Sequence, residues 1–404
     1  MPKVCFYFLL HQPYRLTDFS VLDLDNCDQY FANTTCDQNR DVFLKVADKS
    51  YRPMLSLLLR LVETVPQFHF SFSCSGVFLE QAQTWAPDVI ELLQKLAAHP
   101  EQVEVLGENY YHSLSALYSP AEFARQVRLH SDAVEEILGV TPRIFRNTEM
   151  IYTNDVAAQV ANLGFQGILT EGVDKILSNR QKTRVYRSNS DPAIPVLLKH
   201  AQLSDDIAFR FSQKSWVSWP LTADKYLRWL HDYRDEEIIG LFMDFETFGE
   251  HQWADTGIFE FFADFVHKAA TDDHVDFVTP ASQLCPSGDR QAWLAQLPVY
   301  DVPEPISWAD AERDLSAWRS NDLQVDSLRQ IYALEPQVLA THNSKIIDDW
   351  RRLQTSDHFY YMCTKYFSDG DVHAYFSAYN SPFEAYRRYC IVLADLTDRI
   401  TTSH

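Results

Sequence analysis

The chain has 404 residues, 46% of them hydrophobic, so it can bury a large core and does not have the composition of a disordered protein. Its formal net charge of −21 argues against nucleic acids and anionic membrane surfaces as partners, because both repel a strongly negative surface. A neutral polymer is not repelled in this way.

Short apolar runs alternate with amphipathic helical patterns over about the first 280 residues. The runs predict eight strands: Val4–Leu10, Phe68–Ser73, Val103–Leu106, Arg143–Arg146, Gly167–Leu169, Val196–Leu198, Ile238–Asp244 and Val275–Val278. Strand–helix alternation of this length predicts an α/β fold with a parallel sheet inside and helices outside. Seven or eight such units predict closure into a barrel, whose chemistry lies where the strands end.

Between the strands, apolar residues at helical spacing predict amphipathic helices around residues 54–62, 89–96 and 123–137. Pro120 and Gly139 mark the start and the end of the third helix. Beyond Pro280 the pattern changes, and four helices are expected: Trp308–Trp318, Leu323–Leu334, Pro336–Leu353 and Pro382–Arg399. We therefore predict a catalytic barrel over residues 1–285. Residues 286–404 are expected to form a helical subdomain that packs on the barrel and contributes to the site.

The first apolar run follows a single lysine and precedes no small-residue cleavage site, so it is expected to be a strand and not a signal peptide. No apolar run approaches the ~18 residues needed to span a bilayer. The odd number of scattered cysteines predicts buried free thiols and a cytoplasmic location: Cys5, Cys27, Cys36, Cys74, Cys285, Cys363 and Cys390. The glycosylation sequon Asn33-Thr34-Thr35 carries no weight without a secretion signal.

Two polar segments in the first half of the chain are candidates for the site. His11 and Gln12 directly follow the first predicted strand, where a histidine can donate hydrogen bonds into a site or simply face solvent. Glu104 lies inside an otherwise apolar strand, and a buried carboxylate needs a partner. We favour a role for Glu104 in bracing the site over pairing with an arginine.

The segment Phe145-Arg146-Asn147-Thr148-Glu149 places a carboxylate just past a short strand. Arg146 and Asn147 can hold Glu149 ionised, because a nearby cation and hydrogen bonds lower the pKa of a carboxyl group. An ionised carboxylate is what a nucleophile requires. The alternative is an early helix residue that the helix dipole stabilises.

The apolar strand Ile238–Asp244 delivers Asp244 at its end, with Glu246, Glu250 and His251 close behind. Four ionisable groups within eight positions can raise the pKa of one carboxyl group through repulsion and partial desolvation, as a general acid requires at neutral pH. A solvated acidic loop fits poorly with the interleaved apolar residues, which include the aromatic side chain of Trp253.

Two further polar groups lie later in the chain. Ser356-Asp357-His358 is flanked by aromatic residues in the predicted helical region, and an ordinary helix with a buried aromatic side is equally compatible. Asp205, Asp206 and Arg210 lie near a late strand and are candidates for substrate contact, although a surface loop explains them as well.

Five of these segments, taken in order, resemble the five conserved regions of glycoside hydrolase family 57, and the closest likeness is to its α-amylase subgroup. The segments are His11-Gln12-Pro13, the Glu104 strand, Arg146-Asn147-Thr148-Glu149, Asp244-Phe245-Glu246-Thr247-Phe248-Gly249-Glu250-His251 and Ser356-Asp357-His358. They run from residue 11 to about residue 362, nearly the whole chain. Some members of the amylase-like subgroup lack one or both catalytic residues, whereas both are present here.

The resemblance implies an incomplete (β/α)7 barrel followed by a helical domain, and a double-displacement mechanism that retains the anomeric configuration. By position, the nucleophile falls on Glu149 and the general acid/base on Asp244. His11, Glu104, Asp357 and His358 fall on positions of substrate contact or site support. Gln12, Arg146, Glu246, His251 and Trp253 are our additional substrate-binding candidates. The expected substrate is an α-glucan or maltooligosaccharide, with no metal and no cofactor.

Three alternatives remain open at this stage. A metal-dependent deacetylase on a similar barrel would need closely spaced histidines, and none of the 14 histidines lies two or four residues from another. A catalytically silent glucan-binding protein would not need Glu149 and Asp244 together. Within the enzyme reading, hydrolysis as in α-amylase and transfer as in 4-α-glucanotransferase are not separable from the residues, and branching enzyme or α-galactosidase activity is less favoured.

Overall fold

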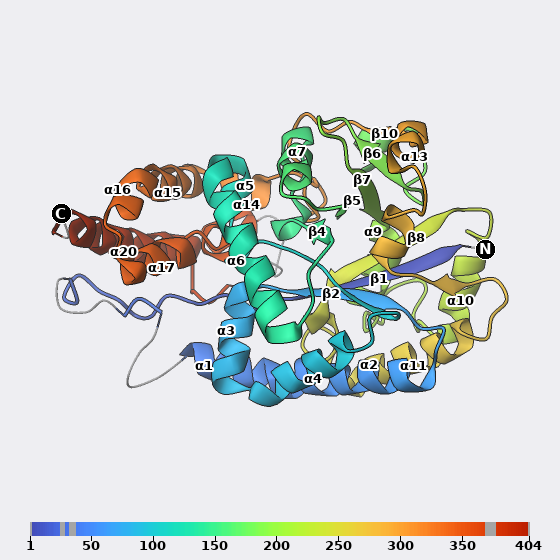
Figure 1. Ribbon diagram of the computed structural model, residues 1–404. Helices are drawn as coiled ribbons and strands as arrows, with labels where there is room; N and C mark the ends of the chain where they lie inside the picture. Colours follow the sequence, from blue (N-terminus) through green and yellow to red (C-terminus); the bar gives the residue numbers. More distant parts are fainter. Residues whose placement is uncertain (1, 25–28, 32–37, 368–376, 403–404) are drawn as a thin grey trace.

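Seven parallel strands form the barrel of the computed structural model, which describes residues 2–24, 29–31, 38–367 and 377–402 (Figure 1). The strands are β1 (Lys3–Leu10), β2 (Phe70–Cys74), β3 (Val103–Val105), β4 (Ile144–Arg146), β5 (Gly167–Glu171), β7 (Pro195–Lys199) and β8 (Ile238–Asp244). They pair in parallel in the order β3-β2-β1-β8-β7-β5-β4. Past the end of β3, a single parallel bridge between Gly107 and Phe145 connects to β4. The predicted incomplete (β/α)7 barrel is confirmed.

Three short strands flank the barrel. The strand β6 (Tyr186–Ser188) is antiparallel to β7, and β10 (Val299–Tyr300) pairs with β6. The strand β9 (Asp276–Phe277) pairs with β1 and is shorter than the predicted run at residues 275–278. Neither β6 nor β10 was expected, because two or three residues are too few to show a periodic pattern. The domain boundary at residues 285–286 remains a prediction, and β10 brings the chain beyond it back to the sheet.

Helices cover the outside of the sheet (Figure 1). They are α1 (Gln38–Val46), α2 (Arg52–Thr64), α3 (Gly76–Trp85), α4 (Pro87–Ala97), α5 (Ser115–Tyr118), α6 (Pro120–Leu138), α7 (Asn154–Asn162), α8 (Asp174–Leu177), α9 (Ala201–Ala208), α10 (Ala223–His231), α11 (Ile258–Ala269), α12 (Pro280–Leu284) and α13 (Arg290–Gln296). The bounds of α6 follow from local chemistry. Ser119 accepts a hydrogen bond from the backbone N–H of Glu122, and Gly139 ends the helix at a φ of 71°.

The alternation of side chains along β1 separates the core from the barrel interior. Phe6 and Phe8 point outward and pack on Phe262 of α11, with ring centroids 5.5 and 6.0 Å away. Tyr7 points inward, and its hydroxyl lies 2.7 Å from Oγ of Ser73 on β2. The apolar outer face holds the helices, while the inner face carries polar side chains toward the end of the barrel.

The C-terminal helices lie together on one side of the barrel, beside α6 (Figure 1). They are α14 (Ser316–Arg319), α15 (Asp322–Ala333), α16 (Glu335–Ala340), α17 (Ser344–Arg352), α18 (Ser356–Tyr360) and α20 (Pro382–Thr402). Two predictions were wrong in detail. Only the end of the segment Trp308–Trp318 is helical, and the expected helix Pro336–Leu353 is interrupted at His342, whose φ is 52°, before Asn343 caps α17.

The five cysteines that the structure describes are free, as predicted: Cys5, Cys74 and Cys363 are buried, while Cys285 and Cys390 are half-buried. Cys27, Cys36 and the sequon Asn33-Thr34-Thr35 lie outside the described residues. Within the described ranges, no helix is both long and apolar enough to cross a membrane.

A buried carboxylate joins the barrel to the C-terminal helices. Glu122 on α6 is fully buried and accepts hydrogen bonds from Arg351 on α17 at 2.7 Å and from Arg125 at 2.7 Å. Arg125 also pairs with Glu335 at the start of α16. A carboxylate enclosed by two guanidinium groups satisfies the charges that the interface buries.

We expect Glu122→Ala to lower the free energy of unfolding by about 3–5 kcal/mol, because it leaves two guanidinium groups without their buried partner. Denaturant unfolding monitored by circular dichroism measures this loss. Asp264→Ala is the control, because it removes an exposed pair with Lys268 on α11 and should cost less than about 1 kcal/mol. Equal losses in the two variants would contradict a special role for the buried carboxylate.

Candidate active site

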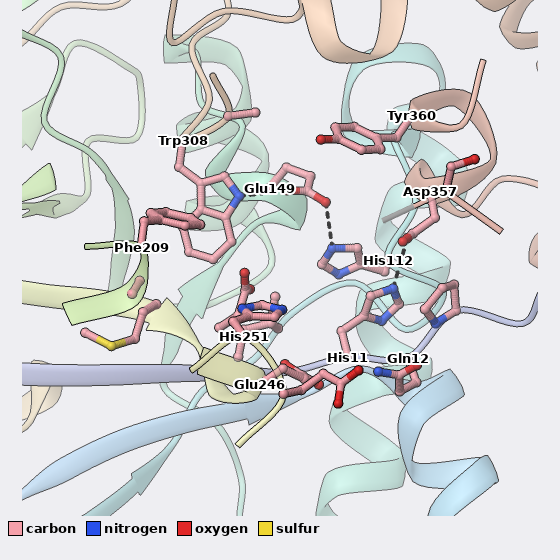
Figure 2. Close-up of a pocket in the computed structure, with 18 of the residues that line it drawn as sticks. His11, Gln12, His112, Glu149, Phe209, Glu246, His251, Trp308, Asp357 and Tyr360 are labelled. Carbon is pink, nitrogen blue, oxygen red and sulfur yellow. Dashed lines mark hydrogen bonds and ion pairs between the residues drawn. The ribbon is translucent and has the colours of Figure 1, made fainter. Parts of the chain in front are cut away.

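A cavity of about 1050 Å³ opens where the barrel strands end. His11 follows β1, Glu149 follows β4 and Asp244 ends β8, and all three line this cavity. The C-terminal part of the chain closes another side with Trp308, Asp357 and Tyr360, as Figure 2 shows. The site is therefore built jointly by the barrel and by the chain that follows it.

Glu149 lies in a 3₁₀ turn after β4 with a φ of 55°, in the left-handed region that non-glycine residues seldom adopt. One carboxylate oxygen, Oε2, accepts a hydrogen bond of 2.7 Å from the indole N–H of Trp308. The other, Oε1, lies 3.4 Å from both Nε2 of His112 and Oγ of Ser356. Figure 2 shows the His112 contact as a dashed line.

The pKa of Glu149 is lowered despite its burial. Burial alone would raise it, but the hydrogen bond and charge of His112 and the charge of Arg146 outweigh that effect. Glu149 is consequently ionised at neutral pH. This is the state that the segment Arg146-Asn147-Thr148-Glu149 was expected to produce, with His112 as an additional cause.

Two stacked imidazoles lie beneath the carboxylate. The rings of His11 and His112 are 4.0 Å apart. Burial opposes protonation of His112, but its contacts with Glu108 and Glu149 raise its pKa to about 9. The pKa of His11 is lowered by burial and by the charge of His112, so we assign the proton of this pair to His112.

A hydrogen-bond network connects this histidine pair to the barrel interior. Nδ1 of His11 lies 2.7 Å from Oγ of Ser75, and its Nε2 lies 3.1 Å from Oδ2 of Asp357 on α18. Behind His112, the fully buried Glu108 accepts a 2.5 Å hydrogen bond from Ser73. The imidazoles are thereby fixed in orientation from both sides.

Asp244 has the opposite protonation behaviour to Glu149. Burial and the negative charge of Glu149 raise the pKa of Asp244 to about 6, even though Arg146, Lys199 and His112 partly offset them. Two carboxyl groups of one cavity thus titrate in different ranges, which separates an acid from a nucleophile. The predicted rise in the pKa of Asp244 is present, but the repelling charge is that of Glu149, which follows another strand, and not that of a residue in the acidic segment.

Glu246 lies two residues beyond Asp244 and also lines the cavity. Burial and the charge of Asp244 raise its pKa to about 8. Its Oε1 accepts a 2.5 Å hydrogen bond from the hydroxyl of Tyr51. A protonated Glu246 can donate a hydrogen bond into the cavity at neutral pH, which a carboxylate cannot do.

A cluster of charges lies beside Trp308. Nζ of Lys199 is 3.0 Å from Asp205 and 3.6 Å from the fully buried Glu171. Arg313 approaches the same two carboxylates at 3.2 and 3.6 Å. The two cations and two anions compensate each other, so this wall of the cavity is rigid and nearly neutral.

The mouth of the cavity carries exposed aromatic rings. Phe209 and Trp253 are 57% and 58% exposed, which is unusual for side chains of this size. Nζ of Lys49 lies 5.3 Å from the Trp253 ring and 3.2 Å from Glu250, which also pairs with Lys45. These contacts hold Trp253 with its ring accessible to a ligand.

Most of the predicted site residues converge on this cavity. Those that line it are His11, Gln12, Glu149, Asp205, Arg210, Asp244, Glu246, His251, Trp253 and Asp357. Arg146 does not line it, but its guanidinium stacks 4.6 Å from the Trp308 ring. Asp206 is not among the lining residues and pairs with Arg210 at 2.5 Å.

Two predicted residues occupy other positions. Glu104 does not line the cavity, and its carboxylate accepts a hydrogen bond from the backbone N–H of Ala281 at 2.7 Å. The prediction that it braces the site is therefore corrected: it binds the first turn of α12, whose N-cap residue is Thr279. His358 is buried, with its ring 6.2 Å from Phe31 and 5.9 Å from Tyr389, and contributes to packing.

Four further residues line the cavity and were not predicted from the sequence: His112, Trp308, Lys199 and Arg313. His112 lies just past β3, so the rule that chemistry follows strand ends would have found it. Trp308 and Arg313 lie in the predicted helix Trp308–Trp318, of which only the end is helical. No local pattern identifies them, because their role arises from tertiary contacts.

A parallel barrel with an ionised carboxylate and a carboxyl group of raised pKa in one cavity is an arrangement that suits a glycosidase. The chain matches the family model described as Glycosyl hydrolase family 57 over residues 5–290. It therefore belongs to this family, whose enzymes are retaining glycoside hydrolases and transglycosylases.

A relative from Methanocaldococcus jannaschii, named "Putative alpha-amylase", is 37% identical over 401 residues, which cover 97% of this chain and 83% of that protein. Two solved structures share the fold. The family 57 branching enzyme from Thermococcus kodakaraensis has a TM-score of 0.69 at 14% identity, over 99% of this chain and 90% of that one. The 4-alpha-glucanotransferase from Thermococcus litoralis has a TM-score of 0.61 at 16% identity, over 89% of this chain and 56% of that one.

The charge of Lys199 is one reason why the pKa of Asp244 does not rise further. We expect Lys199→Met to raise the pKa of Asp244 above about 6, because it removes this cation. Carbon-13 NMR of labelled aspartate carboxyls, with the Asp244 signal assigned from its loss in Asp244→Asn, measures the change. Lys45→Met is the control, since this cation pairs with Glu250. An unchanged Asp244 titration in Lys199→Met would contradict the electrostatic account.

Proposed function

We propose that this enzyme cleaves α-glucans with retention of configuration, using Glu149 as the nucleophile and Asp244 as the general acid/base. The observation that carries the proposal is the opposite shift of two pKa values in one cavity: that of Glu149 is lowered, and that of Asp244 is raised to about 6. A retaining glycosidase needs one carboxylate to attack and one carboxylic acid to protonate the departing oxygen.

The first half of the reaction forms a covalent glycosyl-enzyme. The carboxylate of Glu149 attacks the anomeric carbon, and the glycosidic bond breaks as Asp244 gives its proton to the departing oxygen. Loss of the Glu149 charge removes the repulsion that raised the pKa of Asp244. Its pKa falls, so Asp244 remains ionised and can act as the general base of the next step.

The second half releases the sugar. Asp244 removes a proton from an incoming hydroxyl group, which attacks the anomeric carbon and displaces Glu149 as a carboxylate. The returning negative charge raises the pKa of Asp244 again, so the acid is restored for the next turnover. Water as the acceptor gives hydrolysis, and a sugar hydroxyl gives transfer.

The proposed substrate class is an α-glucan or maltooligosaccharide. The name of the Methanocaldococcus relative, at 37% identity, supports this choice. The cavity supports it as well, because its volume of about 1050 Å³ accommodates several sugar rings and aromatic residues line it on several sides: Phe209, Trp253, Trp308 and Tyr360. The free thiols among the described cysteines support a cytoplasmic location.

Hydrolysis of the α-amylase kind is the primary candidate, and transfer of the 4-α-glucanotransferase kind is the second. The exposed rings of Phe209 and Trp253 favour the second, since they would hold an acceptor sugar at the cavity mouth. Incubation with maltoheptaose separates the two activities. Products that are all shorter than maltoheptaose indicate hydrolysis. Products that are both shorter and longer than maltoheptaose indicate transfer.

A metal-dependent deacetylase has less support. Among the described side chains, no group of three His, Cys, Asp or Glu residues is placed to hold a metal ion. A silent glucan-binding protein also has less support, because binding alone does not require the two carboxyl groups to differ in protonation. Turnover of a glucan by the purified protein rejects both alternatives.

We expect Glu149→Gln and Asp244→Asn each to reduce kcat by at least about 10²–10⁴-fold while the fold is kept, because each removes a group that takes part in bond breaking. Steady-state rates on a maltooligosaccharide and thermal unfolding curves measure the two effects. In Glu149→Ala, azide should partly restore turnover by forming a glycosyl azide. Near-native turnover in Glu149→Ala would show that the nucleophile is another residue.

The two carboxyl groups also set the pH dependence of kcat/KM. Asp244 must hold its proton, so activity should fall as the pH rises through about 6. Glu149 must be ionised, so activity should fall on the acidic side only below the ordinary pKa of a glutamate. A pH series of kcat/KM measures both limbs. If the residual kcat/KM of Asp244→Asn keeps the alkaline limb of the wild type, another group is the acid.

A further inference from the structure

Trp308 makes two hydrogen bonds to the same glutamate. Its indole N–H donates to Oε2 of Glu149 at 2.7 Å, and its backbone N–H donates to the Glu149 carbonyl oxygen at 3.2 Å. The partners of Oε1, in contrast, are 3.4 Å away: Nε2 of His112 and Oγ of Ser356. The carboxylate therefore has one tightly held oxygen and one loosely held oxygen.

Trp308 is itself held in place from several sides. The guanidinium of Arg313 donates to the carbonyl oxygen of Trp308 and pairs with Asp205 and Glu171 of the barrel. The cations of Arg146 and Lys199 lie 4.6 and 5.5 Å from the indole ring. These contacts restrict the ring to one orientation, so its N–H is directed at Glu149 before any substrate binds.

We propose that Trp308 is a positioning residue for the nucleophile: its indole N–H holds Oε2 of Glu149, so that Oε1 is the oxygen that attacks. This inference rests on the proposed function, because it assumes that Glu149 is the nucleophile. It adds an assignment of the two carboxylate oxygens and a role for a residue that lies beyond the barrel strands.

The two oxygens of Glu149 have different roles in both halves of the reaction. In the first half, an electron pair of Oε1 forms the bond to the anomeric carbon, and the glycosidic bond pair leaves with the departing oxygen, which takes the proton of Asp244. The ester carbonyl oxygen is then Oε2, still bonded to the Trp308 N–H. In the second half, the bond between Oε1 and the anomeric carbon breaks and its electron pair returns to the carboxylate.

The indole N–H assists mainly the second half. Negative charge builds up on the Glu149 carboxylate as it departs, and a hydrogen bond to an ionised acceptor is stronger than one to a neutral ester. In the first half the same bond stabilises the reactant carboxylate, so its removal does not slow attack to the same extent. Loss of the N–H should therefore slow release of the sugar more than its attachment.

The acidic limb of the pH profile gives an independent readout. The charged groups that face Glu149 are His112, Arg146, Asp244 and Asp357, and all four remain when only the indole N–H is removed. A hydrogen bond to the ionised form favours that form. Without the indole hydrogen bond, the pKa of Glu149 rises, and the acidic limb of the kcat/KM profile moves to higher pH.

Trp308→Phe tests the proposal with an activated substrate, maltotriosyl fluoride, for which release of the sugar limits the rate. We expect kcat to fall roughly ten- to hundredfold and KM to fall with it, so that kcat/KM changes much less. The glycosyl-enzyme should accumulate in intact-protein mass spectra. The acidic limb of kcat/KM should move to higher pH.

Trp318→Phe is a matched control, because this buried indole lines the same cavity and its nitrogen has no hydrogen-bond partner among the described residues. It should leave the acidic limb where it is in the wild type. If Trp308→Phe fails to fold, benzothienylalanine at position 308 replaces the N–H by sulfur and keeps the ring shape. Equal decreases of kcat and kcat/KM with an unmoved acidic limb would overturn the proposal.

Labelling separates the failure of this inference from the failure of the proposed function. A 5-fluoro maltosyl fluoride traps the glycosyl-enzyme, and peptide mass spectrometry locates the label in the wild type. A label on a residue other than Glu149 overturns the proposed function together with this inference. A label on Glu149 combined with wild-type behaviour of Trp308→Phe overturns the inference alone.

Discussion

The repulsion between Glu149 and Asp244 is the interaction on which the rest of the site depends. Both carboxyl groups line one cavity, and the charge of Glu149 helps to raise the pKa of Asp244 to about 6. Two ionised carboxylates in such a place would be costly, so one proton is retained. His112 and Arg146 lower the pKa of both groups, but only Glu149 also receives a hydrogen bond from His112. This hydrogen bond favours the charge on Glu149 over the charge on Asp244.

The groups that contact Glu149 and His11 come partly from the chain beyond the barrel. His112 follows β3, but Trp308, Ser356 and Asp357 come from the C-terminal segment and contact Glu149 or His11. Glu122 and its arginine partners fix the helices that present this segment to the barrel. A barrel alone would leave Glu149 without its 2.7 Å hydrogen bond from Trp308. The helical region is consequently part of the site and not an independent module.

The sequence predicted the barrel because its strands alternate with helices at regular intervals and end in polar residues. Glu149 and Asp244 were found for the same reason, since each follows an apolar run directly. Glu104 was predicted to brace the site because it is a carboxylate within an apolar strand, but it binds the backbone of Ala281. The carboxylate that contacts His112 is Glu108, which lies past the end of the strand. The role of Trp308 could not be predicted from the sequence, because its contacts arise only from the tertiary structure.

Backbone conformation shows how firmly this site is held. Four of the seven described non-glycine residues with positive φ line the cavity: His112, Glu149, Asp310 and Arg313. Each such conformation costs on the order of 1 kcal/mol or more and persists only where surrounding contacts enforce it. The contacts are those already named, the stacked histidines and the Arg313 pairs with Asp205 and Glu171. Folding free energy is thus used to fix the orientation of the Glu149 carboxylate. In the proposed mechanism, a carboxylate that rotated freely would have to lose that freedom at every turnover.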